Sequence, residues 1–123
     1  MNSPQRTYTI TSQIPKGKVL TYKTLAKLAE VSNPRLVGMY LHRNPYQNIP
    51  CYRVVNSQGK VAKTYAFGGG NVQLKKLQKD GIKDKKRKID LSIYLWFPNE
   101  EESFFIHTLL EKPFSEIEQK YLK

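Results

Sequence analysis

The chain has 123 residues, 39% of them hydrophobic and 25% charged, which predicts one folded domain with or without an appendage and excludes disorder throughout. A single cysteine and two histidines far apart in the sequence exclude an internal disulfide and a multi-cysteine zinc site, so we expect no metal centre. The longest nearly apolar run, residues 91–97, is far shorter than the roughly 20 residues of a membrane-spanning helix, and the first residues lack the apolar core of a signal peptide. We therefore expect no membrane partner and a location in the cytoplasm, associated with the nucleoid, or in the nucleus.

The first part of the chain carries mixed signals. Ser3 followed by Pro4 is typical of the start of a helix, whereas residues 7–11 alternate in polarity as a strand does, and both possibilities stay open. Residues 15–18 predict a turn, and residues 19–21 predict a short extended segment.

Two short helices joined by a tight turn follow. Thr21 can cap a helix over residues 22–30, in which apolar residues recur at helical spacing. Asn33, with proline next, predicts a second helix that runs to about Arg43 and presents Arg35 near its leading end. This arrangement is as typical of an αα-hairpin that only packs as of a DNA-binding helix-turn-helix, so the spacing alone does not decide between them.

Residues 46–90 predict loops, a hairpin and one more helix. Turn-forming residues 56–59 separate two extended segments, and Asn71 can cap a helix that ends at Gly81. The basic residues 83–88 are interpreted as a solvated linker, as the end of a helix or as a patch that contacts phosphates.

The charge changes sign near residue 90, where we place a boundary. Residues 1–90 carry a net charge of +14, and residues 91–123 carry a net charge of −3. The basic part predicts a polyanionic partner, although a basic surface without such a partner stays possible. In the second part we expect a strand over residues 90–97 and then two short helices, which begin at the cap-like pairs Asn99 with Glu102 and Ser115 with Glu118.

The chain's one cysteine lies in residues 44–53, Asn-Pro-Tyr-Gln-Asn-Ile-Pro-Cys-Tyr-Arg. By itself a free cysteine such as Cys51 is more often a small buried hydrophobe than a nucleophile. Arg53 and the basic surroundings would favour the thiolate, which is the reactive form.

Several blocks, in order and at nearly constant spacing, point to one family. They are Ile-Pro-Lys-Gly-Lys-Val at residues 14–19, then Tyr22, Leu25 and Ala26, Arg-Leu-Val-Gly at residues 35–38, Asn44-Pro45, Ile-Pro-Cys-Tyr-Arg-Val-Val at residues 49–55, and Gly59. Together they resemble the C-terminal domain of the O6-alkylguanine-DNA alkyltransferases and their alkyltransferase-like relatives, over roughly residues 3–82.

The resemblance implies a fold and an activity. Residues 1–90 would form a small α/β domain with a winged-helix-like helix-turn-helix that binds the DNA minor groove, and residues 91–123 would add an α/β extension of unknown role. A monomer would bind double-stranded DNA that contains alkylated guanine, flip the guanine out of the duplex and transfer its alkyl group once to a cysteine, without a cofactor.

The resemblance also implies DNA-binding roles for particular residues. Arg35 would fill the space that the flipped base leaves, Tyr22 would help to rotate the phosphate, Leu41 would lie against the base, and Val54 would offer its carbonyl to the guanine amino group. The full set of expected DNA contacts is Tyr22, Lys23, Arg35, Leu41, Arg53 and Val54.

Catalytic roles are implied for four positions. Cys51 would take the alkyl group, and Asn44 would brace the active-site loop. Tyr52 stands where the family has a histidine that makes the thiolate through a water and a glutamate, and Asp80 stands for that glutamate. Tyrosine, with a reference pKa of about 10, accepts protons poorly, although the Tyr52 hydroxyl could still donate through water to Asp80 or fill the space.

Three hypotheses follow from the resemblance and its departures. The first is alkyl transfer to Cys51. The alkyltransferase-like proteins lose the cysteine and keep the histidine, which is the reverse of the pattern here. Because the family's histidine is missing, the second is recognition of alkylated DNA without transfer, with residues 91–123 docking a repair-protein partner. The third is a helix-turn-helix regulator of intact DNA with an inert Cys51.

Overall fold

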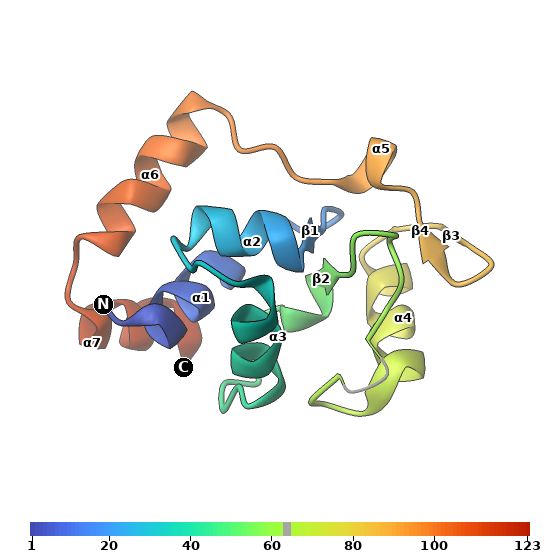
Figure 1. Cartoon of the computed structure of the whole chain (residues 1–123), viewed down its shortest axis with the longest axis horizontal. Helices are drawn as coiled ribbons and strands as arrows, with labels where there is room; N and C mark the ends of the chain where they lie inside the picture. Colours follow the sequence, from blue (N-terminus) through green and yellow to red (C-terminus); the bar gives the residue numbers. More distant parts are fainter. Residues whose placement is uncertain (63–64) are drawn as a thin grey trace.

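The computed structural model describes residues 1–62 and 65–123. Up to residue 90 it contains four helices and four two-residue strands: α1 (Ser3–Thr11), β1 (Leu20–Thr21), α2 (Tyr22–Leu28), α3 (Pro34–His42), β2 (Val54–Val55), α4 (Gly69–Lys79), β3 (Asp84–Lys85) and β4 (Lys88–Ile89). A short 3-10 turn, η1 (Cys51–Arg53), precedes β2 and carries the cysteine. This is the small α/β domain that the sequence predicts, with its sheets reduced to pairs of strands (Figure 1).

The first helix resolves the mixed signals of residues 3–14. Asn2 forms a capping box with Gln5, and proline lies in the first turn. Each threonine hydroxyl at positions 7, 9 and 11 donates to the carbonyl four residues earlier. This bonding satisfies polar, β-branched side chains inside a buried helix, so the strand-like alternation of residues 7–11 was misleading.

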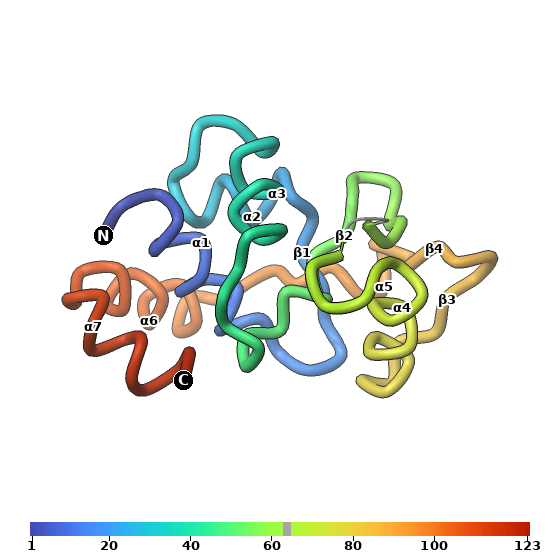
Figure 2. Tube along the Cα trace, turned by 90° about the horizontal axis from the view of Figure 1, so that it is seen from below, coloured from blue at the N-terminus to red at the C-terminus, as the bar shows by residue number. Residues whose placement is uncertain are grey.

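Helices α2 and α3 form the predicted helix pair. Thr21 makes a capping box with Thr24 at the start of α2, and the Asn33 side chain accepts the Arg35 amide at the start of α3. The two helices pack on each other and on α1 (Figures 1 and 2), so their inner faces supply the centre of the main core.

The parallel pair β1–β2 fixes the cysteine relative to these helices. Leu20 lies opposite Val54 and Thr21 opposite Val55, and the connection between the strands contains α2, α3 and η1. Parallel neighbours need such a crossover. Cys51 precedes this pair of strands and lines the same cavity as Tyr22, the first residue of α2.

The turn over residues 56–59 forms as expected, but the extended segment that follows it bridges to β4. The Asn56 amide donates to the Lys60 carbonyl, whereas Lys60 bridges to Lys88. Gly59 has a φ of +81°, and a Cβ there would lie 2.1 Å from the Ile89 carbonyl oxygen, so only glycine fits this approach.

Two expectations for residues 68–90 are wrong. Helix α4 starts after Gly68, at a φ of +127°, rather than at Asn71, although Gly81 does follow its end at a φ of +90°. Residues 83–88 are neither a linker nor a helix end, because β3 and β4 pair antiparallel. The Asp84 carboxylate accepts the Arg87 amide across the turn of this hairpin.

The extension is mainly helical, where we expected α/β structure. It contains α5 (Leu91–Tyr94), α6 (Glu100–Leu110), α7 (Phe114–Ile117) and a π-helical turn, η2 (Glu118–Leu122). The expected strand over residues 90–97 is wrong because the Asp90 side chain accepts the Ser92 amide and caps α5, which leaves one bridge, between Leu95 and Val19.

The helix starts in the extension follow the cap signals only in part. Asn99 and Glu102 form the expected capping box at α6, whereas α7 begins at Phe114, one residue before the expected cap Ser115. No helix in the described part of the chain has the length and apolar character needed to cross a bilayer.

The extension packs against the domain. The Trp96 amide donates to the Val19 carbonyl at 2.8 Å, and the Trp96 and Ile106 side chains belong to the same buried cluster as Ile10 and Ile14. Figures 1 and 2 place α6 and α7 beside α1, with both chain termini at this end of the molecule.

Candidate active site around Cys51

The Cys51 thiol is 4% exposed and borders a cavity of about 30 Å³. This volume holds no more than a few water molecules, so a nucleobase reaches the sulfur only if a lining side chain moves aside. The cavity draws its walls from α2, α3, η1 and the start of α4: Tyr22, Gly38, Leu41, His42, Cys51, Ala62, Tyr65, Ala66 and Gln73.

The surroundings of the thiol act in opposite directions. Burial raises the pKa of Cys51, while hydrogen bonds from Asn44 and Tyr65 and the positive charge of Lys76 lower it without outweighing burial. Because the thiolate is the nucleophile, the reactive fraction at neutral pH is small in the free protein.

Asn44 ties together the loop that leads to the cysteine. Its side chain accepts the Tyr46 amide at 2.8 Å and donates to the Tyr46 carbonyl at 2.9 Å, and the residue is 6% exposed. The same side chain also bonds the Cys51 thiol. This position suits the bracing role that the family resemblance implies.

Tyr52, at the family's histidine position, bonds Asp80 directly rather than through a water. Its hydroxyl donates to Asp80 Oδ1 at 3.1 Å and accepts from Arg53 Nη2 at 3.1 Å. Burial raises the pKa of Tyr52, Arg53 lowers it, and Asp80 raises it. A phenol held in this way is a poor base, so the cluster fills the space of a proton relay without providing one.

Arg53, an expected DNA contact, is used inside the protein. Its Nε donates to Asp80 Oδ2 at 2.7 Å and its Nη1 donates to the Ile14 carbonyl at 2.7 Å, with 14% of the side chain exposed. These bonds hold the end of α4 against η1. The geometry therefore favours a structural role for Arg53 over contact with DNA phosphates.

The other expected DNA contacts divide into two groups. Tyr22 and Leu41 lie at the cavity wall, whereas Lys23 and Arg35 are exposed on α2 and on the first turn of α3. Val54 is 1% exposed, and its carbonyl already accepts Gln73 Nε2 at 2.9 Å. A carbonyl oxygen has two lone pairs, so a guanine amino group would have to share the Val54 carbonyl with Gln73.

Sequence reasoning missed Gln73 and Lys76. Gln73 is 1% exposed, and its side chain accepts the Ala62 amide and donates to the Tyr52 and Val54 carbonyls, which fastens α4 to the cysteine turn. Lys76 reaches the thiol's surroundings from the next turn. Both precede Asp80 at helical spacing, so plotting the helix that ends near Asp80 would have placed all three on one face.

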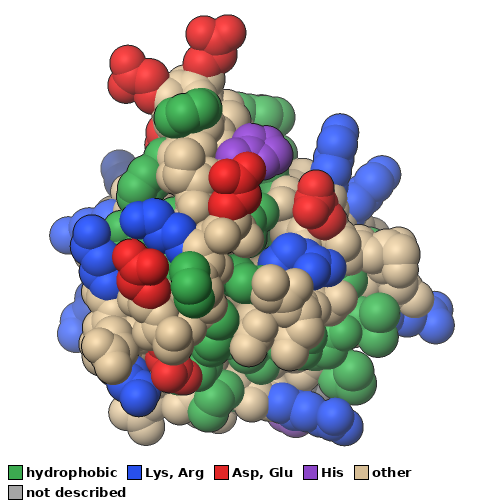
Figure 3. Space-filling model, turned by 90° about the vertical axis from the view of Figure 1, so that its left-hand side faces the viewer, with side chains coloured by type: hydrophobic (Ala, Val, Ile, Leu, Met, Phe, Trp, Pro, Cys, Tyr) green, Lys and Arg blue, Asp and Glu red, His purple; other side chains and the backbone are tan. Residues whose placement is uncertain are grey.

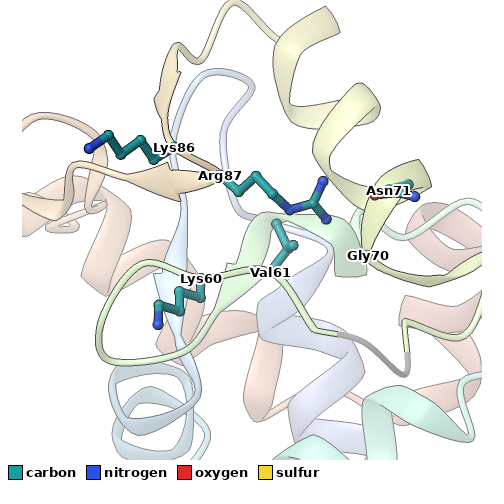
Figure 4. A pocket seen from close by; sticks show the side chains of 6 residues that line it. All are labelled: Lys60, Val61, Gly70, Asn71, Lys86 and Arg87. Carbon is teal, nitrogen blue, oxygen red and sulfur yellow. The ribbon is translucent and has the colours of Figure 1, made fainter.

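A second, basic hollow lies away from the cysteine. It has a volume of about 460 Å³ and is lined by Lys60, Val61, Gly70, Asn71, Lys86 and Arg87. In Figure 4 the Arg87 side chain extends toward the first turn of α4. In the described ranges no group of three or more His, Cys, Asp and Glu side chains could hold a metal ion.

Comparisons with known proteins show the family of the chain. Residues 2–82 match the family model of the 6-O-methylguanine DNA methyltransferase, DNA binding domain. Alkyltransferase-like protein 1 of Schizosaccharomyces pombe is 31% identical over 100 residues, which cover 76% of this chain and 93% of that protein. The DNA base-flipping protein of Vibrio parahaemolyticus is 38% identical over 96 residues, which cover 74% and 92% of the two chains.

Two further similarities concern a longer protein and a solved structure. A bifunctional methyltransferase/endonuclease of Picrophilus torridus is 37% identical over 107 residues, and the match spans 35% of that protein's length. The crystal structure of S. pombe Atl1 in complex with damaged DNA containing O6-carboxymethylguanine aligns with a TM-score of 0.70 at 29% identity, covering 78% of this chain and 95% of that one. The chain thus belongs to the 6-O-methylguanine DNA methyltransferase family, whose DNA-binding domain its residues 2–82 form.

Proposed function

We propose that the protein repairs DNA by binding a duplex that contains O6-alkylated guanine, flipping that guanine toward Cys51 and taking its alkyl group onto the sulfur. The observation that carries the proposal is the chain's single thiol, placed at a cavity walled by the two helices of the helix-turn-helix. The similar Atl1 structure contains DNA with such a lesion. Work on DNA would place the protein in the nucleoid of the cytoplasm or in a nucleus, and the proposal needs only a monomer.

The transfer is a direct displacement at the alkyl carbon. The Cys51 thiol first loses its proton to solvent, and the thiolate attacks the carbon. The S–C bond forms as the bond between carbon and guanine O6 breaks, and the electrons of that bond go to the guanine, which takes a proton from solvent. The thioether product is stable, so one molecule acts once and no cofactor is consumed.

The DNA contacts of the proposal come from exposed residues near the cavity. Arg35 would enter the groove and occupy the space left by the base, and Lys23 would contact a phosphate. Tyr22 and Leu41 would line the flipped guanine. Since the cavity is smaller than a base, the Tyr22 ring would turn outward as the base enters.

Intact mass measurement tests the transfer. After incubation with a duplex that contains one O6-methylguanine, we expect the 14.3 kDa chain to gain one methyl group, mapped to Cys51 by peptide analysis. Cys51→Ala and a duplex with unmodified guanine are the controls. A chain that never gains the group, even at pH 9 and with excess duplex, refutes the transfer.

Recognition without transfer is the second candidate, favoured by the bonding of Tyr52 to Asp80 and by the raised pKa of the thiol. It predicts that Cys51→Ala binds the lesion duplex as tightly as the wild type does, and that the wild type forms no adduct. Equal affinity for alkylated and unmodified duplexes would exclude both candidates and support a regulator of intact DNA.

The extension would serve as the docking surface for a repair-protein partner. Phe97 and Phe104 are 76% and 72% exposed and flank the acidic first turn of α6, residues 100–102. On the face shown in Figure 3, acidic and hydrophobic side chains lie among basic ones. The two exposed phenylalanines beside the acidic turn suit a basic, partly apolar protein segment. Replacing both phenylalanines with serine should abolish cross-linking to such a partner in cells exposed to an alkylating agent, with unchanged affinity for lesion DNA.

A further inference from the structure

Alkyl transfer by Cys51 needs a neighbouring group that stabilises the thiolate, and Tyr52 does not provide one. We infer that Tyr65 and Lys76 stabilise the Cys51 thiolate in place of the family's histidine. The Tyr65 side chain lines the same cavity as the sulfur, and the Lys76 ammonium donates to the Tyr65 oxygen, so the positive charge can act on the sulfur through one hydroxyl group. The contribution of this pair to alkyl transfer rests on the proposed function, whereas its effect on the thiol does not.

The geometry of the pair is well defined. Lys76 Nζ lies 2.9 Å from Tyr65 Oη, and the Tyr65 side chain, in a residue that is 9% exposed, lines the same cavity as Cys51. Burial and then the neighbouring Cys51 raise the pKa of Tyr65, so its hydroxyl keeps the proton that it donates. The phenol is therefore a donor to the thiolate throughout the range in which the thiol titrates.

Aromatic rings hold the ammonium in place. Lys76 Nζ lies 5.2 Å from the ring centroid of Tyr65, 5.7 Å from that of Phe67 and 5.8 Å from that of Tyr52. The Tyr65 and Phe67 rings also pack edge to face, with their centroids 5.9 Å apart. Rings on several sides limit the water around the charge, and a charge with less water around it acts more strongly on a nearby anion.

The other polar groups around the thiol do not supply this charge. Arg53 and Asp80 form an ion pair at 2.7 Å, so their opposite charges largely cancel at the sulfur. Burial raises the pKa of Tyr22, which keeps that phenol neutral. The groups that face the thiol or the pair from neighbouring elements are Lys16, Tyr22, His42, Asn44, Tyr52, Arg53, Lys79 and Asp80.

The pair differs from a histidine relay in its chemistry. A Lys76 ammonium that already holds its proton cannot accept another, so the thiol proton leaves to solvent and the pair only lowers the free energy of the thiolate. The pair should consequently change the midpoint of the thiol titration while the transfer rate still follows the thiolate fraction.

The single cysteine allows a direct test. Cysteine labelled with 13C at Cβ gives one resonance in the full-length protein, and its chemical shift against pH reports the Cys51 titration without DNA or a reagent. We expect Lys76→Met, which removes the charge and keeps most of the stem, to raise the midpoint by about half a unit to one unit, a roughly three- to tenfold loss of thiolate at a given pH below it.

Matched variants sharpen the test. Lys75→Met removes an exposed charge from the same helix and should leave the midpoint unchanged. Lys76→Arg keeps the charge, so its midpoint should stay close to that of the wild type. Tyr65→Phe should raise the midpoint as well. In the double variant Tyr65→Phe/Lys76→Met the midpoint should rise by less than the sum of the two single shifts, because the two side chains act through one chain of hydrogen bonds.

Three results would overturn the inference: an unchanged midpoint in Lys76→Met, an equal rise in Lys75→Met, or strict additivity in the double variant. Circular dichroism melts of each variant check that the fold is kept, and Tyr65→Phe answers the question if Lys76→Met unfolds, because it breaks the same chain of hydrogen bonds. If the midpoints shift as expected but the wild type never gains a methyl group, the transfer proposal fails and the assignment of the pair stands.

Discussion

The domain of residues 1–90 and the extension of residues 91–123 contribute different things to one core. The domain is strongly basic and supplies most of the buried cluster that includes Cys51, whereas the acidic extension contributes apolar residues such as Trp96 and Ile106 to that cluster. Figures 1 and 2 place the segment between α5 and α6 on the side of α2 opposite α3. The acidic first turn of α6, residues 100–102, follows this segment.

The extension nevertheless reaches the loop that leads to the cysteine. The Tyr46 hydroxyl donates to the Glu118 carboxylate, the Tyr46 ring lies 6.5 Å from that of Phe114, and Leu122 is buried with Ile49 and Tyr8. Tyr46 is also the residue that Asn44 bonds. The comparison therefore suggests a division of labour, in which the domain supplies recognition and chemistry and the extension stabilises the cysteine loop.

The largest expected effect concerns the chemistry that we assign to the domain alone. Because burial raises the pKa of Cys51, the transfer rate should follow the thiolate fraction and increase by about two to three orders of magnitude between pH 6 and pH 9. Single-turnover adduct formation, followed by mass across this range, measures it. A flat profile would mean that another group sets the rate.

The next effect tests whether the extension is needed for stability. Trp96 is 6% exposed and Phe97 is 76% exposed, so two neighbouring residues provide a matched pair. Trp96→Ala should lower the free energy of unfolding by about 3–5 kcal/mol, and Phe97→Ala by less than about 0.5 kcal/mol. Urea denaturation of the full-length variants measures both, and a small loss for Trp96→Ala would show that the extension is only loosely attached.

Recognition should depend on the domain and not on the extension. Arg35→Ala should weaken binding to the lesion duplex by about tenfold, and Lys23→Ala should lower the salt slope of binding by about one unit. Lys112→Ala, in the extension, is the control and should change neither value. Fluorescence anisotropy at several salt concentrations measures these effects, and unchanged binding in Arg35→Ala would move the DNA surface away from α3.

The parts that sequence reasoning predicted well are those with local causes. The caps Thr21, Asn33 and Asn99 are local hydrogen-bond signals, and each marks the start of a helix as predicted. The turn of the β3–β4 hairpin was missed because Lys86 and Arg87 adopt positive φ values of 52° and 64°, where Asn and Gly are the usual residues.

The candidate site shows the same limit. The family blocks led to Cys51, Asn44 and Asp80, because those residues lie in or near recognisable motifs. Tyr65 and Lys76 reach Cys51 only once α4 packs on η1, and no local pattern contains that contact. Long-range contacts between unlike segments are what sequence periodicity does not record.

The smallest effect isolates the bond between the two parts. Tyr46→Phe removes the hydroxyl that bonds Glu118 and should lower the free energy of unfolding by about 1 kcal/mol near neutral pH.

The pH dependence of this loss follows from the pKa of Tyr46, which burial, followed by Glu118, raises to about 12. A phenol whose pKa is raised on folding stabilises the fold fully below its unfolded value of about 10, and that contribution is lost as the pH rises to about 12. Urea unfolding of the wild type and Tyr46→Phe should therefore differ at pH 8 and converge only as the pH reaches about 12, whereas a difference that persists there would assign the loss to packing against Phe114 instead of to the hydrogen bond.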